Sequence, residues 1–390
     1  MRVRTARLLQ PGQKIRVLVV DDSVVIRRLV CHALEEDPGI EVVGVAANGR
    51  IALSRLTQLV PDVITLDIEM PEMDGLDMLR ELRRQDRATP VVMFSTMTER
   101  GAAATFDALS LGADDYVTKA SNAGSLDVSL GNLRHELIPK LRQFFEMARP
   151  QAAAPQTPSA RAILPSANRS LRRAVAIGVS TGGPAALAKL VPQFPGDFPL
   201  PIFVVQHMPP LFTRLLAERL DTLTPLSVGE GVEGETPVPG RIYIAPGDRH
   251  MRVVNSDRGP AIALDQGPPL NSCRPAVDAL FGSLAEIYGP AVVAAVLTGM
   301  GHDGTAGAQR LAARGSYIVA QDEATSVVWG MPGAVVDAGV ANEILPLEDV
   351  VAAILREVDC PCPRRRITSA IFNSTFTPVR ASCWMPKSSI

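Results

Sequence analysis

The chain has few cysteines, little net charge and no long apolar run, and each shortage narrows what it can be. Its five cysteines are odd in number and scattered, so a disulfide framework is not expected and a reducing compartment is. A formal net charge of -2 argues against a general nucleic-acid binder. No apolar run approaches the ~18 residues of a membrane span, and the start lacks the apolar core of a signal peptide. We therefore expect a cytoplasmic protein.

The hydrophobic pattern divides the chain into two α/β parts. Residues 14–148 alternate short apolar runs with amphipathic stretches, which predicts a doubly wound parallel sheet, and a last helix is expected over 126–147. Residues 149–170 hold four prolines, many alanines and no acid, as in a linker. The α/β rhythm returns over 171–359. The predicted strands lie at 15–20, 40–46, 63–66, 91–94, 116–117, 174–179, 202–206 and 291–297.

Two stretches of the second part depart from this rhythm. Residues 226–265 are rich in glycine and proline with short β-like runs such as 241–245, which suggests a small antiparallel excursion from a mostly parallel sheet. The basic tail, 360–390, has no periodicity and is expected to be disordered. Near its start, Cys360 and Cys362 form a Cys-Pro-Cys pair, a weak metal signal without further ligands.

Polar side chains follow four of the predicted strands of the first part. Asp21 and Asp22 come after the first strand, Asp67 closes the third, and Ser95 and Lys119 follow the fourth and fifth. The carboxyl ends of parallel strands meet at one edge, where such sheets bind ligands. One strand-end aspartate is usually a helix cap, but three clustered carboxylates favour a hard cation such as Mg²⁺. A phosphoryl group would then meet the metal on one side and Lys119 on the other.

In the second part, Ser180 stands where an apolar strand breaks into glycines, in Ile-Gly-Val-Ser-Thr-Gly-Gly-Pro at 177–184. A strand-to-helix turn of this kind exposes a serine as a nucleophile elbow does, although glycine-rich turns also bind phosphate or simply turn. His207 ends the next strand, and Asp303 lies in a glycine loop after a third. The three residues therefore reach one sheet edge with the chemistry of a Ser-His-Asp triad.

The remaining histidines and the chain order bear on this hypothesis. His32 and His135 fall in predicted helices, and His250 lies in the irregular β region, where a loop role is expected. His302 is adjacent to Asp303 in sequence, and side chains of adjacent residues rarely face each other. The alternative role for Asp303 is a helix N-cap. Amides of the 298–301 loop are candidates for an oxyanion hole. The order Ser, His, Asp departs from the Ser, Asp, His order of α/β-hydrolases, so that fold is not expected.

Three motifs of the first part surround these strand ends: Val-Asp-Asp-Ser (20–23), Leu-Asp-Ile-Glu-Met-Pro-Glu-Met-Asp-Gly (66–75) and Gly-Ala-Asp-Asp-Tyr-Val-Thr-Lys (112–119). With these motifs the first part resembles the receiver domain of two-component response regulators. The resemblance implies a flavodoxin-like strand order of 2-1-3-4-5 and a phosphoryl-accepting Asp67, with Mg²⁺ held by Asp21, Asp22, Asp67 and the backbone carbonyl of Glu69. It also makes Ser95, Tyr116 and Lys119 the switch residues.

Five motifs follow in order in the second part: Ile-Gly-Val-Ser-Thr-Gly-Gly-Pro (177–184), Val-Gln-His-Met-Pro (205–209), Ile-Ala-Pro-Gly-Asp-Arg-His-Met (244–251), Arg-Pro-Ala-Val-Asp-Ala-Leu-Phe (274–281) and Leu-Thr-Gly-Met-Gly-His-Asp-Gly (297–304). With these motifs the chain from about residue 15 to 358 resembles the chemotaxis response-regulator protein-glutamate methylesterases. The resemblance implies a triad of Ser180, His207 and Asp303, with Met300 in the oxyanion-hole loop and Thr181 beside the nucleophile.

This second resemblance also implies an activity and partners. The expected reactions are hydrolysis of glutamate methyl esters on methylated chemoreceptors, which releases methanol, and deamidation of receptor glutamines. A chemotaxis sensor histidine kinase is the expected phosphoryl donor. Mg²⁺ is expected for receiver phosphorylation, no cofactor for ester hydrolysis, and neither nucleic-acid binding nor membrane insertion. The unphosphorylated receiver is expected to pack over the esterase cleft.

Two non-catalytic outputs are the alternatives. A phosphate- or nucleotide-binding output through 178–184 lacks the lysine of a G-x-x-x-x-G-K-[ST] loop and leaves His207 and Asp303 without a role. A DNA-binding output is not supported either, since the second part shows no basic helix-turn-helix pattern and the basic tail contains only one cluster, at 364–366.

Overall fold

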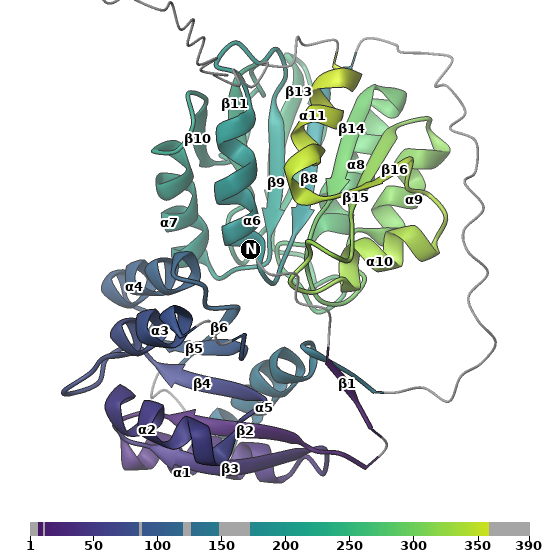
Figure 1. Ribbon diagram of the computed structural model, residues 1–390. Coiled ribbons are helices and arrows are strands. Elements are labelled where there is room, and N and C mark those ends of the chain that lie inside the picture. Colours follow the sequence, from purple (N-terminus) through teal and green to yellow (C-terminus); the bar gives the residue numbers. More distant parts are fainter. Residues whose placement is uncertain (1–6, 11, 86–87, 120–125, 148–171, 359–390) are drawn as a thin grey trace, which may run out of the picture.

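The computed structural model describes residues 7–10, 12–85, 88–119, 126–147 and 172–358. Two α/β bodies are stacked in it, with the N-terminal body below the C-terminal one in Figure 1. The predicted linker at 149–170 and tail at 360–390 lie outside the described residues.

The N-terminal body is built on a five-stranded parallel sheet in the order β3-β2-β4-β5-β6. Counted without the short β1, this is the predicted order 2-1-3-4-5. Every residue of β4 and β5 is buried, as expected for strands covered by helices on both faces. The strands are β2 (Ile15–Val20), β3 (Ile40–Ala46), β4 (Val63–Asp67), β5 (Val91–Ser95) and β6 (Asp115–Thr118); the helices are α1 (Val24–Glu35), α2 (Gly49–Leu59), α3 (Gly75–Arg84), α4 (Glu99–Ser110) and α5 (Leu126–Arg142).

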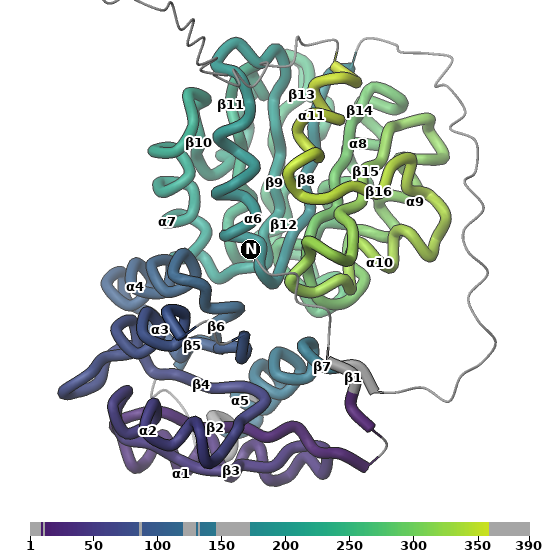
Figure 2. Tube along the Cα trace, viewed as in Figure 1, coloured from purple at the N-terminus to yellow at the C-terminus, as the bar shows by residue number. Residues whose placement is uncertain are grey.

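The last helix of this body is shorter than predicted, because the end of the predicted range 126–147 forms a short strand. Helix α5 ends at Arg142, and the next residues form β7 (Phe145–Met147), which pairs in parallel with β1 (Arg7–Leu9). The two short strands form a separate two-stranded sheet near the end of α5, as Figure 2 shows. The pairing joins segments far apart in the chain, and such a tertiary partner overrides a local helical pattern.

The C-terminal body is built on a seven-stranded parallel sheet in the order β10-β11-β9-β8-β14-β15-β16. Helices α8 and α9 pack together on one face, and α6 packs with α7 and α11 on the other. The strands are β8 (Ala174–Val179), β9 (Ile202–Gln206), β10 (Ser227–Glu230), β11 (Arg241–Ile244), β14 (Val292–Val296), β15 (Tyr317–Gln321) and β16 (Glu343–Leu345); the helices are α6 (Gly183–Leu190), α7 (Pro210–Asp221), α8 (Val277–Ile287), α9 (Thr305–Ala313), α10 (Gly330–Asp337) and α11 (Leu347–Glu357).

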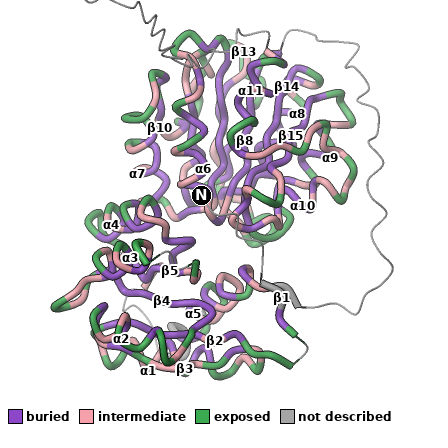
Figure 3. The backbone as a smooth tube through the Cα atoms, viewed as in Figure 1, coloured by how far each residue is buried: buried purple, intermediate pink, exposed green. Residues whose placement is uncertain are grey.

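The two faces of this sheet contribute to separate apolar cores. Along β8, Val175 and Ile177 join one cluster, while Ala174 and Ala176 join the other, because successive side chains of a strand point to opposite faces. Figure 3 shows the resulting buried strands between more exposed helices.

The antiparallel excursion predicted within residues 226–265 is confirmed, but one of the short runs in that range belongs to the main sheet. Strand β11, at 241–244, is a parallel member of the main sheet between β10 and β9. The antiparallel part is the hairpin of β12 (His250–Ser256) and β13 (Gly259–Asp265). Only the run at 241–245 was misplaced, because a short apolar run does not reveal the direction of its partner strand. His250 is likewise not a loop residue: it begins β12, is buried, and its Nε2 lies 3.0 Å from the carbonyl oxygen of Pro268.

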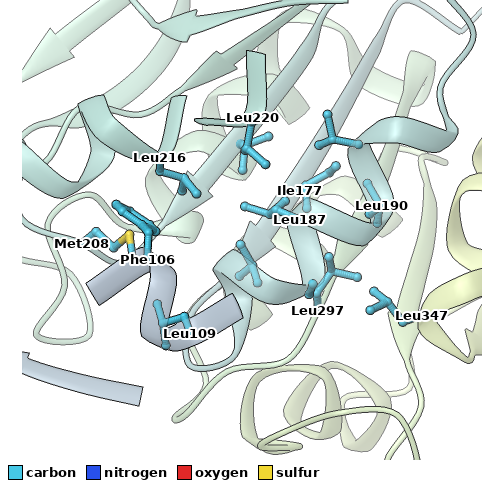
Figure 4. Packing of buried hydrophobic residues seen from close by; sticks show 14 of the residues in the cluster. Phe106, Leu109, Ile177, Leu187, Leu190, Met208, Leu216, Leu220, Leu297 and Leu347 are labelled. Atoms are coloured by element: carbon cyan, nitrogen blue, oxygen red, sulfur yellow. The ribbon is translucent and has the colours of Figure 1, made fainter. Parts of the chain in front are cut away.

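The two bodies meet through an apolar contact. Helix α4 of the N-terminal body packs against α6 and α7. Figure 4 shows Phe106 and Leu109 of α4 among Met208, Leu216 and Leu187 of the C-terminal body. The ring of Tyr116 stacks on that of Phe212 with centroids 4.7 Å apart, and both residues are buried. One apolar cluster therefore spans both bodies.

Candidate active site

Ser180 lies in the tight turn between β8 and α6. Its amide donates to the carbonyl of Thr298, and its carbonyl accepts from Gln206 Nε2, each at 3.0 Å. The turn needs glycine, because Gly182 has a φ of 77° and a Cβ on Gly183 would lie 1.9 Å from Gln206 Oε1. The serine is thus fixed between the ends of β9 and β14.

His207 follows β9 at the same edge and is paired with Asp303. Its Nε2 lies 2.8 Å from Asp303 Oδ2. Register explains the meeting, since Val179 pairs with Gln206 and each strand then turns at its next residue. Sequence reasoning therefore placed Ser180, His207 and Asp303 at one edge, and the structure brings them there.

Asp303 is held by many donors. The carboxylate is 2% exposed and accepts from the His207 ring, from the side-chain amide of Asn271 and from three backbone amides, those of Val277, Asp278 and Gly304. Burial works against the charged form, but the bond from His207 and the other donors outweigh it and lower the pKa of Asp303. The carboxylate is therefore a fixed anion behind the imidazole. It also accepts from the amides of Val277 and Asp278 at the start of α8.

The other ring nitrogen of His207 faces a residue that the sequence analysis passed over. Nδ1 lies 3.5 Å from Cys273 Sγ, whereas Ser180 Oγ makes no hydrogen bond to any described residue. Burial would lower the pKa of His207, but the hydrogen bonds with Asp303 and Cys273 prevail and raise it to about 9. The raised pKa favours the protonated ring in this arrangement. In the sequence, the one feature that pointed to this region was the motif at 274–281, which Cys273 directly precedes.

The loop after β14 supplies candidate oxyanion donors. Met300 is 38% exposed, and the Cβ of Ser180 would lie 2.8 Å from a Cβ built on Gly299. The amides of Thr181 and Met300 donate no backbone hydrogen bond within the described part of the chain. Free amides next to the serine hydroxyl are the donors that a tetrahedral oxyanion requires.

A second cluster lies at the carboxyl edge of the N-terminal sheet. Carboxylate oxygens of Asp21, Asp22 and Asp67 lie within 4.8 Å of one another. Lys119 Nζ is 2.8 Å from Asp67 Oδ1 and 3.0 Å from Asp21 Oδ2. Burial raises the pKa of Asp67 to about 6 although Lys119 opposes the shift. Three converging oxygen donors at an edge fit Mg²⁺, and the charge of Lys119 fits an anion beside it.

The predicted switch residues occupy two places. Ser95 lies at the end of β5, and its buried Oγ is 2.6 Å from Thr105 Oγ1 of α4. Tyr116 points instead to the contact between the bodies, where it stacks on Phe212. Glu69 follows β4 by two residues and is exposed, and its side chain is 3.6 Å from Arg100. Helix α4 thus links the carboxylate cluster with the interface.

The interface reaches the residue next to Ser180. Thr181 Oγ1 lies 2.9 Å from Asp115 Oδ2 of the N-terminal body and 3.0 Å from Gln143 Oε1. Asp115 also accepts from Gln143 Nε2 at 3.0 Å and from Lys140 Nζ at 3.3 Å. Asp115 and Thr181 are both buried. The sequence analysis did not single out Asp115, although it adjoins the predicted switch Tyr116.

A receiver-type sheet joined to a second α/β sheet that carries Ser, His and Asp at one edge defines a response regulator with a hydrolase output. Family models agree: the response regulator receiver domain matches residues 17–130 and the CheB methylesterase matches residues 175–354. Protein-glutamate methylesterase/protein-glutamine glutaminases are similar over most of the chain. The protein from Nocardioides sp. is 50% identical over 358 residues (89% of this chain, 96% of the relative), and that from Trichodesmium erythraeum is 46% identical over 349 residues (88% and 99%).

Among solved structures, the CheB methylesterase catalytic domain of Thermotoga maritima is 43% identical and covers 47% of this chain and 98% of its own, with a TM-score of 0.47. The chain belongs to the protein-glutamate methylesterase/protein-glutamine glutaminase family, and it is a hydrolase of the response-regulator type. The predicted family, fold class and enzyme class are thereby confirmed. No helix in the described ranges is long and apolar enough to cross a membrane.

Proposed function

We propose that this chain hydrolyses glutamate methyl esters on methylated chemoreceptors, releasing methanol, and deamidates receptor glutamines, and that its esterase is activated when a sensor histidine kinase phosphorylates the receiver. The observation that carries the proposal is the 2.8 Å His207–Asp303 pair at the sheet edge that also carries the half-buried Ser180. The working division of the chain is receiver 14–148, linker 149–170, methylesterase 171–359 and tail 360–390.

The proposed chemistry is acyl transfer through the serine. Ser180 Oγ attacks the ester carbonyl carbon while His207 Nδ1 takes its proton, after the ring has turned from Cys273 toward the serine. Amides near Thr181 and Met300 stabilise the oxyanion, a contribution of ~3 to 4 kcal/mol per donor in related sites. The methoxide leaves with the proton from His207 as methanol. Water then hydrolyses the acyl-serine by the same route, and Asp303 stabilises the imidazolium throughout.

The proposed switch begins at Asp67. Asp21, Asp22 and the carbonyl of Glu69, with Asp67 itself, would hold Mg²⁺, which supplies charge neutralisation for the incoming phosphoryl group when bound. Lys119 contacts the same carboxylates. Ser95 is hydrogen-bonded to α4, the helix that packs on α6 and α7, so a change at Ser95 is transmitted to the Tyr116–Phe212 contact. Weakening that contact would uncover Ser180.

The direct test is methanol release from methylated receptor, measured with and without an acyl phosphate and Mg²⁺. We expect Asp67→Asn to keep a basal rate and to lose the stimulation, because the amide cannot accept the phosphoryl group while the second sheet is untouched. Asp77→Asn, an exposed carboxylate on α3, is the matched control and should respond like the parent. Stimulation that persists in Asp67→Asn would assign the switch to another residue.

The raised pKa of His207 predicts a pH dependence. Only the neutral ring accepts a proton, so the basal rate should rise about tenfold per pH unit below the pKa and level off above about 9. The measurement is the initial rate of methanol release between about pH 6 and 10, with a Ser180→Ala sample at each pH to subtract spontaneous ester hydrolysis. A rate that is flat over this range would show that the ring is already neutral in the reactive state.

A further inference from the structure

The thiol of Cys273 lies next to the histidine of the proposed triad, but it has no role in the proposed hydrolysis. Its Sγ lies 3.5 Å from His207 Nδ1, and it is half-buried at the same edge. The opposite ring nitrogen is bound by Asp303 at 2.8 Å. One sulfur, one imidazole nitrogen and one carboxylate oxygen come within 4.8 Å of one another here.

From this cluster we propose that Cys273 and His207 chelate Zn²⁺, and that bound zinc switches the esterase off. Thiolate and imidazole are the two ligands that zinc prefers in proteins. A tetrahedral ion with Zn–S of about 2.3 Å and Zn–N of about 2.0 Å holds the sulfur and nitrogen about 3.5 Å apart. The distance between Sγ and Nδ1 in the protein is 3.5 Å, so both ligands already stand at the required separation.

The surroundings of the histidine fit a metal ligand. A zinc-bound imidazole almost always gives its second ring N–H to a carboxylate, which fixes the tautomer and makes the ligand more basic. Asp303 already has this position opposite Nδ1 and is held in place by backbone amides. The His207 side chain is 13% exposed, so an ion can reach the ring. Water completes the coordination.

Inhibition follows from which atom the metal takes. His207 Nδ1 is the nitrogen that must accept the Ser180 proton in the proposed hydrolysis, and a lone pair bound to zinc accepts none. On binding, the Cys273 thiol and Nδ1 of the protonated His207 ring each give a proton to solvent and the Zn–S and Zn–N bonds form, without any redox step. The site itself rests only on geometry; its inhibitory effect rests on the proposed function.

The binding test uses the full chain with Cys31, Cys360, Cys362 and Cys383 replaced by alanine, so that Cys273 is the one remaining thiol. Co²⁺ is titrated as a spectroscopic substitute for Zn²⁺. We expect a thiolate-to-cobalt charge-transfer absorption that saturates at one ion per chain and disappears when Zn²⁺ is added. Further replacement by Cys273→Ala should abolish the band. A band that is missing in the parent, or present in Cys273→Ala, would overturn the site.

The inhibition test follows basal methanol release by the same protein in the Asp67→Asn background, with excess Mg²⁺, so that zinc cannot act through the receiver. The half-inhibitory zinc concentration should rise at least about tenfold in Cys273→Ala and fall back only in part in Cys273→Ser, each rate being taken relative to its own zinc-free value. Equal zinc sensitivity of parent and Cys273→Ala would overturn the proposal. A parent without zinc-free methanol release would contradict the proposed function instead, and the cobalt spectrum would still decide the site.

Discussion

Ser180→Ala is expected to lower kcat for methanol release by on the order of 10⁴- to 10⁶-fold, because loss of the nucleophile of a serine triad removes the whole covalent route and leaves only binding and oxyanion contacts. The alanine fits the turn without strain, since the serine hydroxyl makes no hydrogen bond to the described residues and the backbone bonds to Thr298 and Gln206 stay. Methanol release from methylated receptor under stimulating conditions measures the effect.

Two controls isolate the chemistry from the fold. Ser227→Ala removes an exposed serine from the edge strand β10 and should leave the rate unchanged. Phosphorylation of Asp67 by acyl phosphate should be intact in Ser180→Ala, because the two groups belong to different sheets. Substantial methanol release by Ser180→Ala would contradict the assignment, and Cys273→Ala in that background would then test whether the thiol beside His207 is the nucleophile.

The sheet edges were predictable from the sequence for a physical reason. Buried parallel strands read as short apolar runs, and the residue that follows each run must lie at the carboxyl edge of the sheet. Asp67, Ser180 and His207 each follow or close such a run, so their meeting places needed no knowledge of long-range contacts. The same logic carried Asp303, which sits in the loop after β14.

Features that depend on contacts between distant segments were not predictable. The pairing of β1 with β7 and the parallel direction of β11 are set by partner strands, which a run of apolar letters does not name. Cys273 reaches His207 because the chain returns to the edge after the β12–β13 hairpin, and no local periodicity encodes that return. The bond from Thr181 to Asp115 likewise requires the mutual placement of two bodies.

That bond leads to the second large effect: Asp115→Ala should raise the esterase rate of the unphosphorylated protein. The substitution removes the carboxylate that accepts from the buried Thr181 hydroxyl and from Lys140, and the loss of a buried hydrogen bond to a charged group costs about 1 to 3 kcal/mol. If this cost falls on the closed arrangement, the ratio of open to closed protein rises about 5- to 150-fold. The basal rate of methanol release should rise with this ratio, up to the rate of the phosphorylated protein at most. The stimulation by acyl phosphate should therefore become smaller.

Asp115 also binds groups of its own receiver, so the same change can loosen the receiver sheet, and urea unfolding of each variant separates this effect from opening. Asp115→Asn keeps an acceptor for Thr181 and should restore much of the inhibition.

Asp107→Ala is the matched control at the rim of the interface. Its ion pair with Arg219 spans the same two bodies at 3.1 Å, but the Asp107 side chain is 59% exposed. An exposed pair contributes only about 0 to 1 kcal/mol, so this variant should change the basal rate at most a few-fold. Equal basal rates in Asp115→Ala, Asp107→Ala and the parent would mean that the closed arrangement is held by the Tyr116–Phe212 stack and the α4 contacts alone, and that the buried carboxylate next to the nucleophile turn does not restrain it.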